Sequence, residues 1–362
     1  MNRICSPSAR ILVTGGAGFI GLEVCAQLAE LGFDVRVLDN LRADVHPDPD
    51  FSLTRVGKVV DSMVGDVRDA DTADRALSGV DTVIHLAAKV GLGVGVADLP
   101  DYASSNDYGT ACLLAAAARA EVSNFVLASS MVVYGEGVGR CPEHGDVRPA
   151  ARPESWLTQG RFEPPCPICQ QELLPALVNE SSPTDPRNAY AASKLAQEHL
   201  ATTWARETRG RLRILRYHNV YGAGLPLNTP YAGVAALWLT ELRAGRAPQV
   251  FEDGQQRRDF IHVSDIAAAT IAATGLTSAA TAVTSDEVVW TYNVGSGQVR
   301  TIGEMATSLA AAFGGPAPMV TGRYRLGDVR HITADSTRLH RELELPTPIE
   351  LPDGLAGLVA AV

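Results

Sequence analysis

Short hydrophobic runs alternate along the chain with longer stretches that repeat apolar residues at helical spacing. Runs of strand length occur at residues 10–14, 34–38, 81–85, 124–128 and 212–216. The stretches of helical spacing between them are residues 22–31, 105–120 and 189–209. This alternation predicts an α/β fold with a doubly wound, mainly parallel sheet and helices on both faces.

The alternation breaks at residues 136–186, which are rich in Pro, Cys and charge. A structureless segment of this length is improbable inside a compact domain, so this insert needs its own source of order. Beyond Tyr221, amphipathic helices are expected at residues 233–244, 264–275 and 302–313. We predict a first domain over residues 1–222, which contains the insert. A smaller substrate-binding lobe over residues 223–362 would follow, with the chain crossing back near 257–275.

Composition and charge narrow the class of protein. The 362 residues are 46% hydrophobic and 20% charged, which predicts a packed core. The net charge of −10 argues against nucleic acid or an anionic membrane as partner. No apolar run approaches the length of a membrane span, and no signal-peptide pattern precedes residue 11. We therefore expect a cytoplasmic protein with no membrane partner.

A glycine cluster between the first strand and the first helix indicates a cofactor site. Gly15, Gly18 and Gly21 form G-x-x-G-x-x-G. Residues without Cβ let a pyrophosphate approach the backbone, and the following helix offers it free N–H groups. A glycine triplet alone is weak evidence, but its position between strand and helix favours a Rossmann-type dinucleotide site.

The end of the second strand indicates which dinucleotide binds. A carboxylate at Asp39 can accept hydrogen bonds from the adenosine ribose and would repel a 2′-phosphate, so NAD is favoured over NADP. The alternative is an Asp that only caps a turn. The remaining residues expected around NAD are Phe19, Ile20, Asn40, Asp66, Val67, Leu86, Ala87, Ala88 and Asn106.

A tyrosine and a lysine at helical spacing predict the catalytic base. Tyr190 and Lys194 lie at i and i+4, on one helix face. A nearby ammonium favours the phenolate, and the lysine could also hydrogen-bond the nicotinamide ribose. Ser130 follows the strand at 124–128, where it could hold a substrate alcohol beside the tyrosine. Without the glycine turn and this serine, Y-x-x-x-K would indicate only an exposed helix face.

Together these motifs resemble the nucleotide-sugar epimerase/dehydratase family of extended short-chain dehydrogenases/reductases. The likeness spans nearly the whole chain except the insert. Its motifs are TGGAGFIG at 14–21, LDN at 38–40, GDV at 65–67, HLAA at 85–88, SS at 129–130 with YG at 134–135, Tyr190 with Lys194, RYHNVYG at 216–222, RRDFIHV at 257–263, YNVG at 292–295 and RLGDV at 325–329.

The resemblance implies a role for individual residues. Ser130, Tyr190 and Lys194 match the family's catalytic triad, and Tyr190 and Lys194 also border NAD. Asn106 matches an Asn near the cofactor. The residues implied to bind the substrate are Ser130, Asn219, Arg258, Arg325 and Asp328. Guanidinium groups suit a diphosphate because each can donate two parallel hydrogen bonds to a phosphate. The alternative is that each Arg is only a solvated surface charge.

The residues after Ser130 favour one reaction of the family. Its dehydratases carry an Asp-Glu pair where this chain has Met131 and Val132, which cannot transfer protons. The resemblance then implies epimerisation at C4 of a nucleotide sugar, by transient oxidation and return of the hydride. The alternative is a one-way NAD(P)H-dependent 4-ketoreductase of a dTDP-4-keto-6-deoxyhexose. A non-catalytic NAD sensor is a third class, which the intact triad disfavours.

A finer resemblance indicates the substrate. Residues 222–230, the VFEDG segment at 250–254 and the Cys-bearing insert resemble the dTDP-L-rhamnose 4-epimerases of this family. A dTDP-6-deoxy-L-hexose is therefore favoured over a UDP-sugar. By analogy with the family, we expect a homodimer formed through the helices near 105–120 and 189–209.

The insert carries a candidate metal site. Cys141-Pro-Glu-His144 and Cys166-Pro-Ile-Cys169 are two short knuckles, and their three thiols and one imidazole are typical of structural zinc. Zinc could replace the apolar core that the segment lacks. The alternatives are four unligated residues in a polar loop, or a Cys166–Cys169 redox pair.

Overall fold

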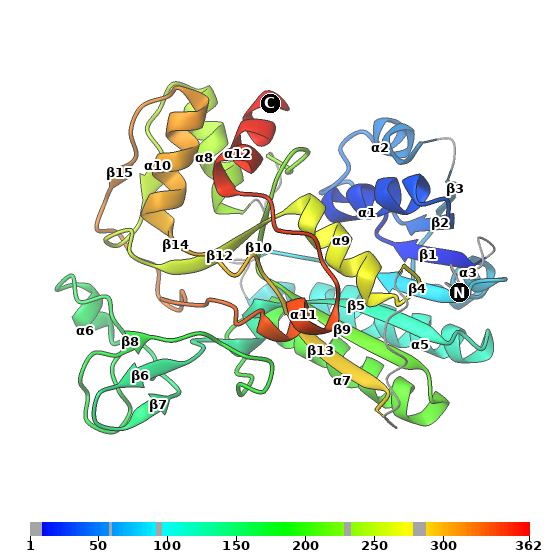
Figure 1. Ribbon diagram of the computed structural model, residues 1–362, viewed down its shortest axis with the longest axis horizontal. Helices are drawn as coiled ribbons and strands as arrows, with labels where there is room; N and C mark the ends of the chain where they lie inside the picture. Colours follow the sequence, from blue (N-terminus) through cyan, green and yellow to red (C-terminus); the bar gives the residue numbers. More distant parts are fainter. Residues whose placement is uncertain (1–8, 58–59, 92–95, 228–232, 278–286) are drawn as a thin grey trace.

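The computed structural model describes residues 9–57, 60–91, 96–227, 233–277 and 287–362, so the end of segment 222–230 lies outside it. Its centre is a seven-stranded sheet in the order β13-β9-β5-β4-β1-β2-β3, in which every adjacent pair is parallel (Figure 1). The strands are β1 Arg10–Thr14, β2 Asp34–Asp39, β3 Asp61–Val64, β4 Thr82–His85, β5 Asn124–Ser130, β9 Arg211–Tyr217 and β13 Val289–Val294. The predicted α/β fold with a doubly wound parallel sheet is confirmed.

Helices cover the sheet on both faces. One face packs against α1 and α9, the other against α3, α5 and α7. Each face has its own apolar core, and the strands between them are buried on both sides. The helices are α1 Phe19–Glu30, α2 Pro49–Val56, α3 Ala70–Leu77, α5 Gly109–Arg119, α7 Ala189–Thr208 and α9 Val263–Ala273.

A second lobe lies above the carboxyl edge of the sheet in Figure 1. Its core is formed by three helices that pack on a small mixed sheet and on a two-stranded pair. These elements are α8 Val234–Arg243, α10 Ile302–Phe313, α12 Leu351–Ala360, β10 Asn219–Tyr221, β12 Arg257–His262, β14 Val299–Thr301, β11 Gln249–Val250 and β15 Met319–Val320. Among the described helices, none is long and apolar enough to cross a membrane.

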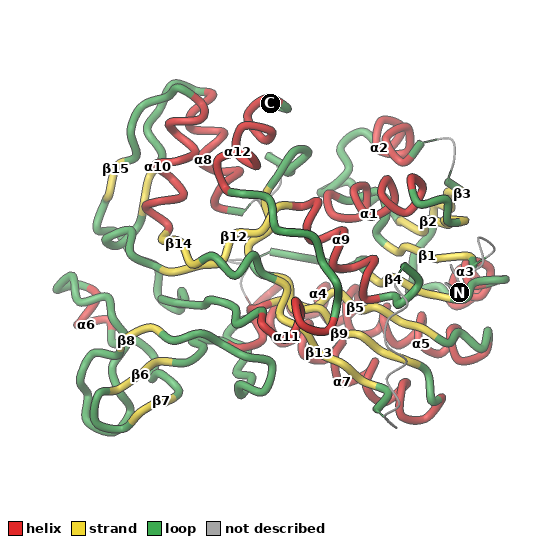
Figure 2. Tube along the Cα trace, viewed as in Figure 1, coloured by secondary structure: helices red, strands yellow, loops and turns green. Residues whose placement is uncertain are grey.

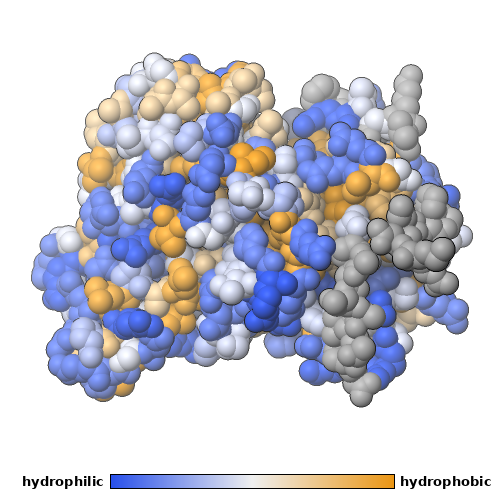
Figure 3. All heavy atoms as spheres, viewed as in Figure 1, coloured by the Kyte–Doolittle hydropathy of each residue, from blue (hydrophilic) through white to orange (hydrophobic). Residues whose placement is uncertain are grey.

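The insert forms a separate projection made mostly of loops (Figure 2). Three short strands form one antiparallel sheet, and their surface in the space-filling view is mainly hydrophilic (Figure 3). The elements are β6 Gly139–Cys141, β7 Gly145–Val147, α6 Glu154–Leu157 and β8 Leu174–Pro175. Its apolar core is small and consists of Cys141, Cys166 and Leu173, with Val147 and Cys169 against it.

Two features of the main sheet differ from the sequence expectation. The sequence predicts that the chain crosses back to the first domain near 257–275, but the chain also does so later, at β13, which is the edge strand of the main sheet beside β9. At the opposite edge, β3 is a short strand with mostly exposed residues. In addition, the helix expected at 105–120 begins as the π-helical turn Ala103–Tyr108 before α5. The sequence does not predict β3, because a strand exposed at the edge of a sheet does not need an apolar face.

Candidate active site

The glycine turn is held against the end of β4. Gly15 has φ +71°, and a Cβ on it would lie 2.7 Å from the backbone nitrogen of Ala87. A Cβ on Gly21 would lie within contact of the Gly15 carbonyl oxygen. At Gly18, by contrast, the nearest atom to a Cβ would be that oxygen at 3.3 Å. Packing within the chain therefore requires Gly15 and Gly21, while Gly18 leaves space at the turn for a pyrophosphate.

The helix that follows this turn has an open N-terminus. Its N-cap is Gly18, without a side-chain hydrogen bond, and its first turn has no acidic residue. Phe19 and Ile20 are the first residues of the helix, and the backbone N–H groups of such a first turn have no partner within the helix. The turn thus fits the phosphates of NAD, as the sequence predicts.

Asp39 lies at the carboxyl end of β2 and is 8% exposed. Its Oδ2 accepts a hydrogen bond from the backbone N–H of Ala17 (3.1 Å), and its Oδ1 accepts one from Leu41 (3.0 Å). The carboxylate therefore helps to hold the glycine turn. Each oxygen has a second lone pair, so Asp39 can still accept from ribose hydroxyls.

Replacement of Asp39 by Asn should reduce the discrimination between NAD⁺ and NADP⁺. The wild-type carboxylate repels a 2′-phosphate, so we expect NAD⁺ to bind at least about tenfold more tightly. Calorimetric dissociation constants for both cofactors would test this. Equal affinities in the wild type would contradict the ribose role of Asp39.

Asn40 and Asp66 meet beside Asp39 in the structure. The Asn40 amide donates to Asp66 Oδ2 (3.0 Å), and Arg68 forms an ion pair with the same carboxylate (2.7 Å). Burial alone would raise the pKa of Asp66, but the hydrogen bonds from Arg68 and Asn40 hold it at about 2. A charged carboxylate thus borders the expected adenine position next to Val67, which is buried.

The end of β4 supplies the backbone run Leu86, Ala87 and Ala88. The Leu86 N–H donates to the Thr14 carbonyl (3.0 Å), which places this run beside the glycine turn. Asn106 is fully buried, and its amide bonds both the backbone of Lys89 and the hydroxyl of Ser193. Any effect of Asn106 on the cofactor would therefore pass through the segments that it holds together.

Ser130, Tyr190 and Lys194 come together at the carboxyl edge of the sheet. Ser130 ends β5, and Tyr190 lies in the first turn of α7, whose N-cap Asn188 accepts from the N–H of Ala191 (2.9 Å). The Ser130 hydroxyl lies beside the Tyr190 phenol and favours its charged form. Lys194 Nζ donates to the Ala128 carbonyl (2.9 Å).

The pKa values in this group differ from the sequence expectation. Burial raises the pKa of Tyr190 to about 12, and the Ser130 hydroxyl only partly offsets this. Burial also lowers the pKa of Lys194 to about 8, although Glu198 acts in the opposite direction. The predicted lowering of the Tyr190 pKa by the ammonium is thus not present in this arrangement: burial raises the pKa, and the Lys194 ammonium donates to the Ala128 carbonyl rather than to the phenol.

Two of the residues expected to bind the substrate lie on neighbouring strands of the small sheet. Arg258 is on β12, and Asn219 begins β10, which pairs with β12. The Arg258 guanidinium donates to the carbonyls of Val329 (2.8 Å) and Arg330 (2.9 Å), and burial lowers its pKa to about 10. It forms no ion pair with a described carboxylate. Asn219 Oδ1 is buried and has no partner among the described residues. A desolvated cation that forms no close ion pair fits an anionic ligand, although Asp328, Glu252 and Glu136 act on it from farther away.

Arg325 and Asp328 occupy an exposed loop of the second lobe. The Arg325 guanidinium lies 5.0 Å from the centre of the Phe251 ring. The Asp328 carbonyl accepts from Arg152 of the insert (2.6 Å). Burial raises the pKa of the Asp328 carboxyl, while Arg325 and Arg258 oppose this shift.

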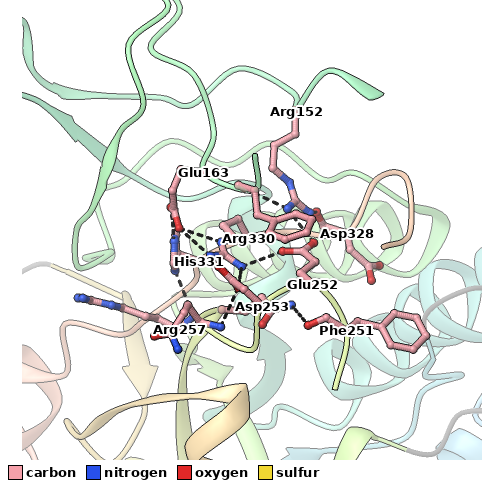
Figure 4. A network of polar contacts seen from close by, with 12 residues as sticks. Arg152, Glu163, Phe251, Glu252, Asp253, Arg257, Asp328, Arg330 and His331 are labelled. Carbon is pink, nitrogen blue, oxygen red and sulfur yellow. Dashed lines mark hydrogen bonds and ion pairs between the residues drawn. The ribbon is translucent and has the colours of Figure 1, made fainter. Parts of the chain in front are cut away.

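A buried charge network behind this loop was missed by sequence reasoning (Figure 4). Arg330 is 1% exposed and forms ion pairs with Glu163 of the insert (2.7 Å), Glu252 (2.8 Å) and Asp253 (2.7 Å). Arg152 of the insert also pairs with Glu252 (2.7 Å). The network joins the insert to the loop that supplies the carbonyl partners of Arg258. The available signal was the VFEDG segment, which contains two of its carboxylates.

A second network lies behind the triad. Glu198 of α7 forms a buried ion pair with Arg216 (2.7 Å), and Arg216 donates to the Tyr134 hydroxyl (2.8 Å). Tyr134 in turn donates to Asn293 Oδ1 (2.7 Å). Arg216 and Tyr134 belong to the quoted family motifs, whereas no sequence motif indicated Glu198. The network fixes α7, which carries Tyr190, against β9 and β13.

The four candidate metal ligands of the insert converge. Their ligand atoms all lie within 4.8 Å of one another. Cys141 Sγ lies 3.7 Å from Cys169 Sγ and 3.4 Å from His144 Nδ1, and Cys166 Sγ lies 3.7 Å from the same nitrogen. A zinc tetrahedron with bonds of about 2.3 Å to sulfur has edges of about 3.8 Å. None of the described cysteines forms a disulfide.

Comparison with known proteins gives the class. The NAD dependent epimerase/dehydratase family model matches residues 11–155 and 170–295. The chain therefore belongs to this family, as its motifs predict, and the expected epimerase class is confirmed. The gap in the match falls within the insert.

Several individual proteins are similar to this chain over nearly its whole length. The chain is 35% identical over 330 residues to a dTDP-L-rhamnose 4-epimerase of Burkholderia thailandensis, covering 90% of this chain and 87% of that protein. It is 29% identical to a UDP-glucose 4-epimerase of Neisseria gonorrhoeae, covering 92% and 91%. A solved UDP-glucose 4-epimerase of Thermus thermophilus, in complex with NAD, is 27% identical with a TM-score of 0.72, covering 97% and 98%.

Proposed function

We propose that this protein is an NAD-dependent nucleotide-sugar 4-epimerase acting on a dTDP-6-deoxy-L-hexose such as dTDP-L-rhamnose. The observation that carries the reaction is the Ser130–Tyr190–Lys194 group at the edge where the glycine turn opens. The absence of acid at Met131 and Val132 argues against dehydration. The preference for this sugar rests on the likeness to the Burkholderia enzyme.

Each catalytic residue has a distinct task in this proposal. Tyr190 removes the proton of the sugar 4-hydroxyl and later returns it, while Ser130 holds that hydroxyl in place. When bound at the glycine turn, NAD⁺ would supply the acceptor and donor for the C4 hydride. Lys194, whose pKa of about 8 leaves it mostly charged at neutral pH, hydrogen-bonds the nicotinamide ribose. Arg258, with Asn219, holds the diphosphate, and Arg325 and Asp328 border it.

The test of substrate and reaction is a panel of dTDP- and UDP-hexoses incubated without added reductant. We expect dTDP-L-rhamnose to reach equilibrium with dTDP-6-deoxy-L-talose, as measured by NMR, with no net change of cofactor. Conversion of UDP-glucose and of no other sugar would overturn the proposed substrate. Turnover only of a 4-keto sugar with added NADH or NADPH would instead identify the 4-ketoreductase.

We also propose that Cys141, His144, Cys166 and Cys169 bind a structural zinc. Support comes from the spacing of the ligand atoms, which fits a tetrahedron with all four positions filled by protein. Such a site has no open position for catalysis. Zinc would instead order the insert, whose apolar core is small. The homodimer and the cytoplasmic location remain predictions from the sequence.

A further inference from the structure

His218 is a buried imidazole that the fold does not use. It follows β9, precedes Asn219 and is 4% exposed, and neither ring nitrogen has a hydrogen-bond partner among the described residues. Leaving two polar atoms buried without partners costs free energy of folding, so such a group requires an explanation.

His85 illustrates how a structural histidine is satisfied in the same protein. It is equally buried, but its Nδ1 is bonded to Thr14 (2.7 Å) and its Nε2 to Thr110 (2.9 Å). Burial lowers the pKa of both imidazoles to about 3, so both are neutral. The difference between them is that the donor and the acceptor of His218 have no hydrogen-bond partner among the described residues.

The strand register places His218 beside the catalytic group. Ser130 is paired with Tyr217, and the His218 N–H donates to the Val294 carbonyl (3.0 Å), which continues the sheet by one residue. Arg216 contacts Glu198 of α7, whereas Tyr217 contacts Thr270 of α9. Because side chains alternate along a strand, His218 lies on the α7 face, the face of Tyr190.

We infer that His218 hydrogen-bonds a hydroxyl of the sugar ring and thereby contributes to the choice of sugar. A neutral imidazole has one donor and one acceptor, on nitrogens that point in different directions. The hydroxyls of a sugar ring can each donate or accept, so neighbouring hydroxyls can pair with both nitrogens. A diphosphate offers only acceptors and would leave one ring nitrogen unpaired. The neighbouring Arg258 already provides a cation for that charge. This inference rests on the proposed function.

The test compares His218→Phe with the wild type on the nucleotide sugar that the wild type converts, dTDP-L-rhamnose in the first instance. We expect kcat/KM to fall about tenfold, the loss of one hydrogen bond to a neutral group. The dissociation constant of dTDP should change less than about twofold, since dTDP lacks the hexose that His218 would contact. The melting temperature without ligand should not fall, because the variant removes two unpaired buried atoms.

Two further variants complete the test. His218→Gln, which retains one donor and one acceptor, should recover part of the loss, and exposed His199→Gln should leave kcat/KM unchanged. A His218→Phe enzyme within about twofold of wild-type kcat/KM would overturn the inference, as would an equal loss of dTDP affinity. If the wild type converts no sugar of the panel, the proposed function fails instead.

Discussion

Tyr190→Phe should reduce turnover by at least about 10²–10⁴, the usual contribution of a positioned acid–base group. The substitution removes only the hydroxyl that takes and returns the proton of the sugar alcohol. NAD⁺ binding should persist, because the glycine turn and Asp39 belong to β1, α1 and β2, and their contacts do not use this hydroxyl. Turnover by NMR and NAD⁺ affinity by calorimetry measure the two effects separately.

Tyr108→Phe is the matched control for this prediction. It loses the same hydroxyl from a tyrosine that is 58% exposed, and it should keep wild-type turnover. Near-normal turnover in Tyr190→Phe would contradict the assignment of the base. The pH profile provides a second check: burial raises the pKa of Tyr190, so turnover of the wild type should increase with pH as the phenolate forms.

Removal of zinc is expected to have the second large effect, on the insert and on the sugar site. Structural zinc contributes about 10–16 kcal/mol to folding in small peptides, more than the few apolar contacts of the insert supply. Cys166→Ser should reduce zinc from about one per chain to nearly none. Hydrogen exchange should then show loss of protection over residues 136–186.

The effect should reach the sugar site through the charge network. Glu163 and Arg152 of the insert pair with Arg330 and Glu252, and the Arg330 carbonyl accepts from Arg258. A disordered insert leaves Arg330 and Glu252 with fewer partners, so KM for the nucleotide sugar should rise while NAD⁺ affinity stays nearly intact.

Cys112→Ser is the control for this variant, because Cys112 lies on α5, outside the cluster. It should retain zinc, protection and KM. A metal-free wild-type protein with a fully protected insert would contradict the zinc proposal. Elemental analysis of protein purified without chelators decides between these outcomes.

The amino-acid pattern alone predicts the central sheet and the local parts of the candidate site. Strands buried on both faces are continuous apolar runs, and the glycine turn and the Tyr190–Lys194 spacing are set within one turn of chain. The convergence of the four candidate metal ligands was also predictable, because each pair of these residues is local in sequence and only two pairs had to meet. These features depend on neighbours in sequence, which is why pattern alone predicts them.

Which distant charges meet, and which groups lose contact with water, depends on how segments far apart in sequence pack together. The ion pairs of Arg330 join residues from the insert and from two segments of the second lobe, and no local pattern specifies such contacts. The raised pKa of Tyr190 has the same origin, since burial by segments distant in sequence disfavours the phenolate, while the Lys194 ammonium one helical turn away donates to Ala128 instead. The two unpaired nitrogens of His218 likewise became evident only once the packing around them was known.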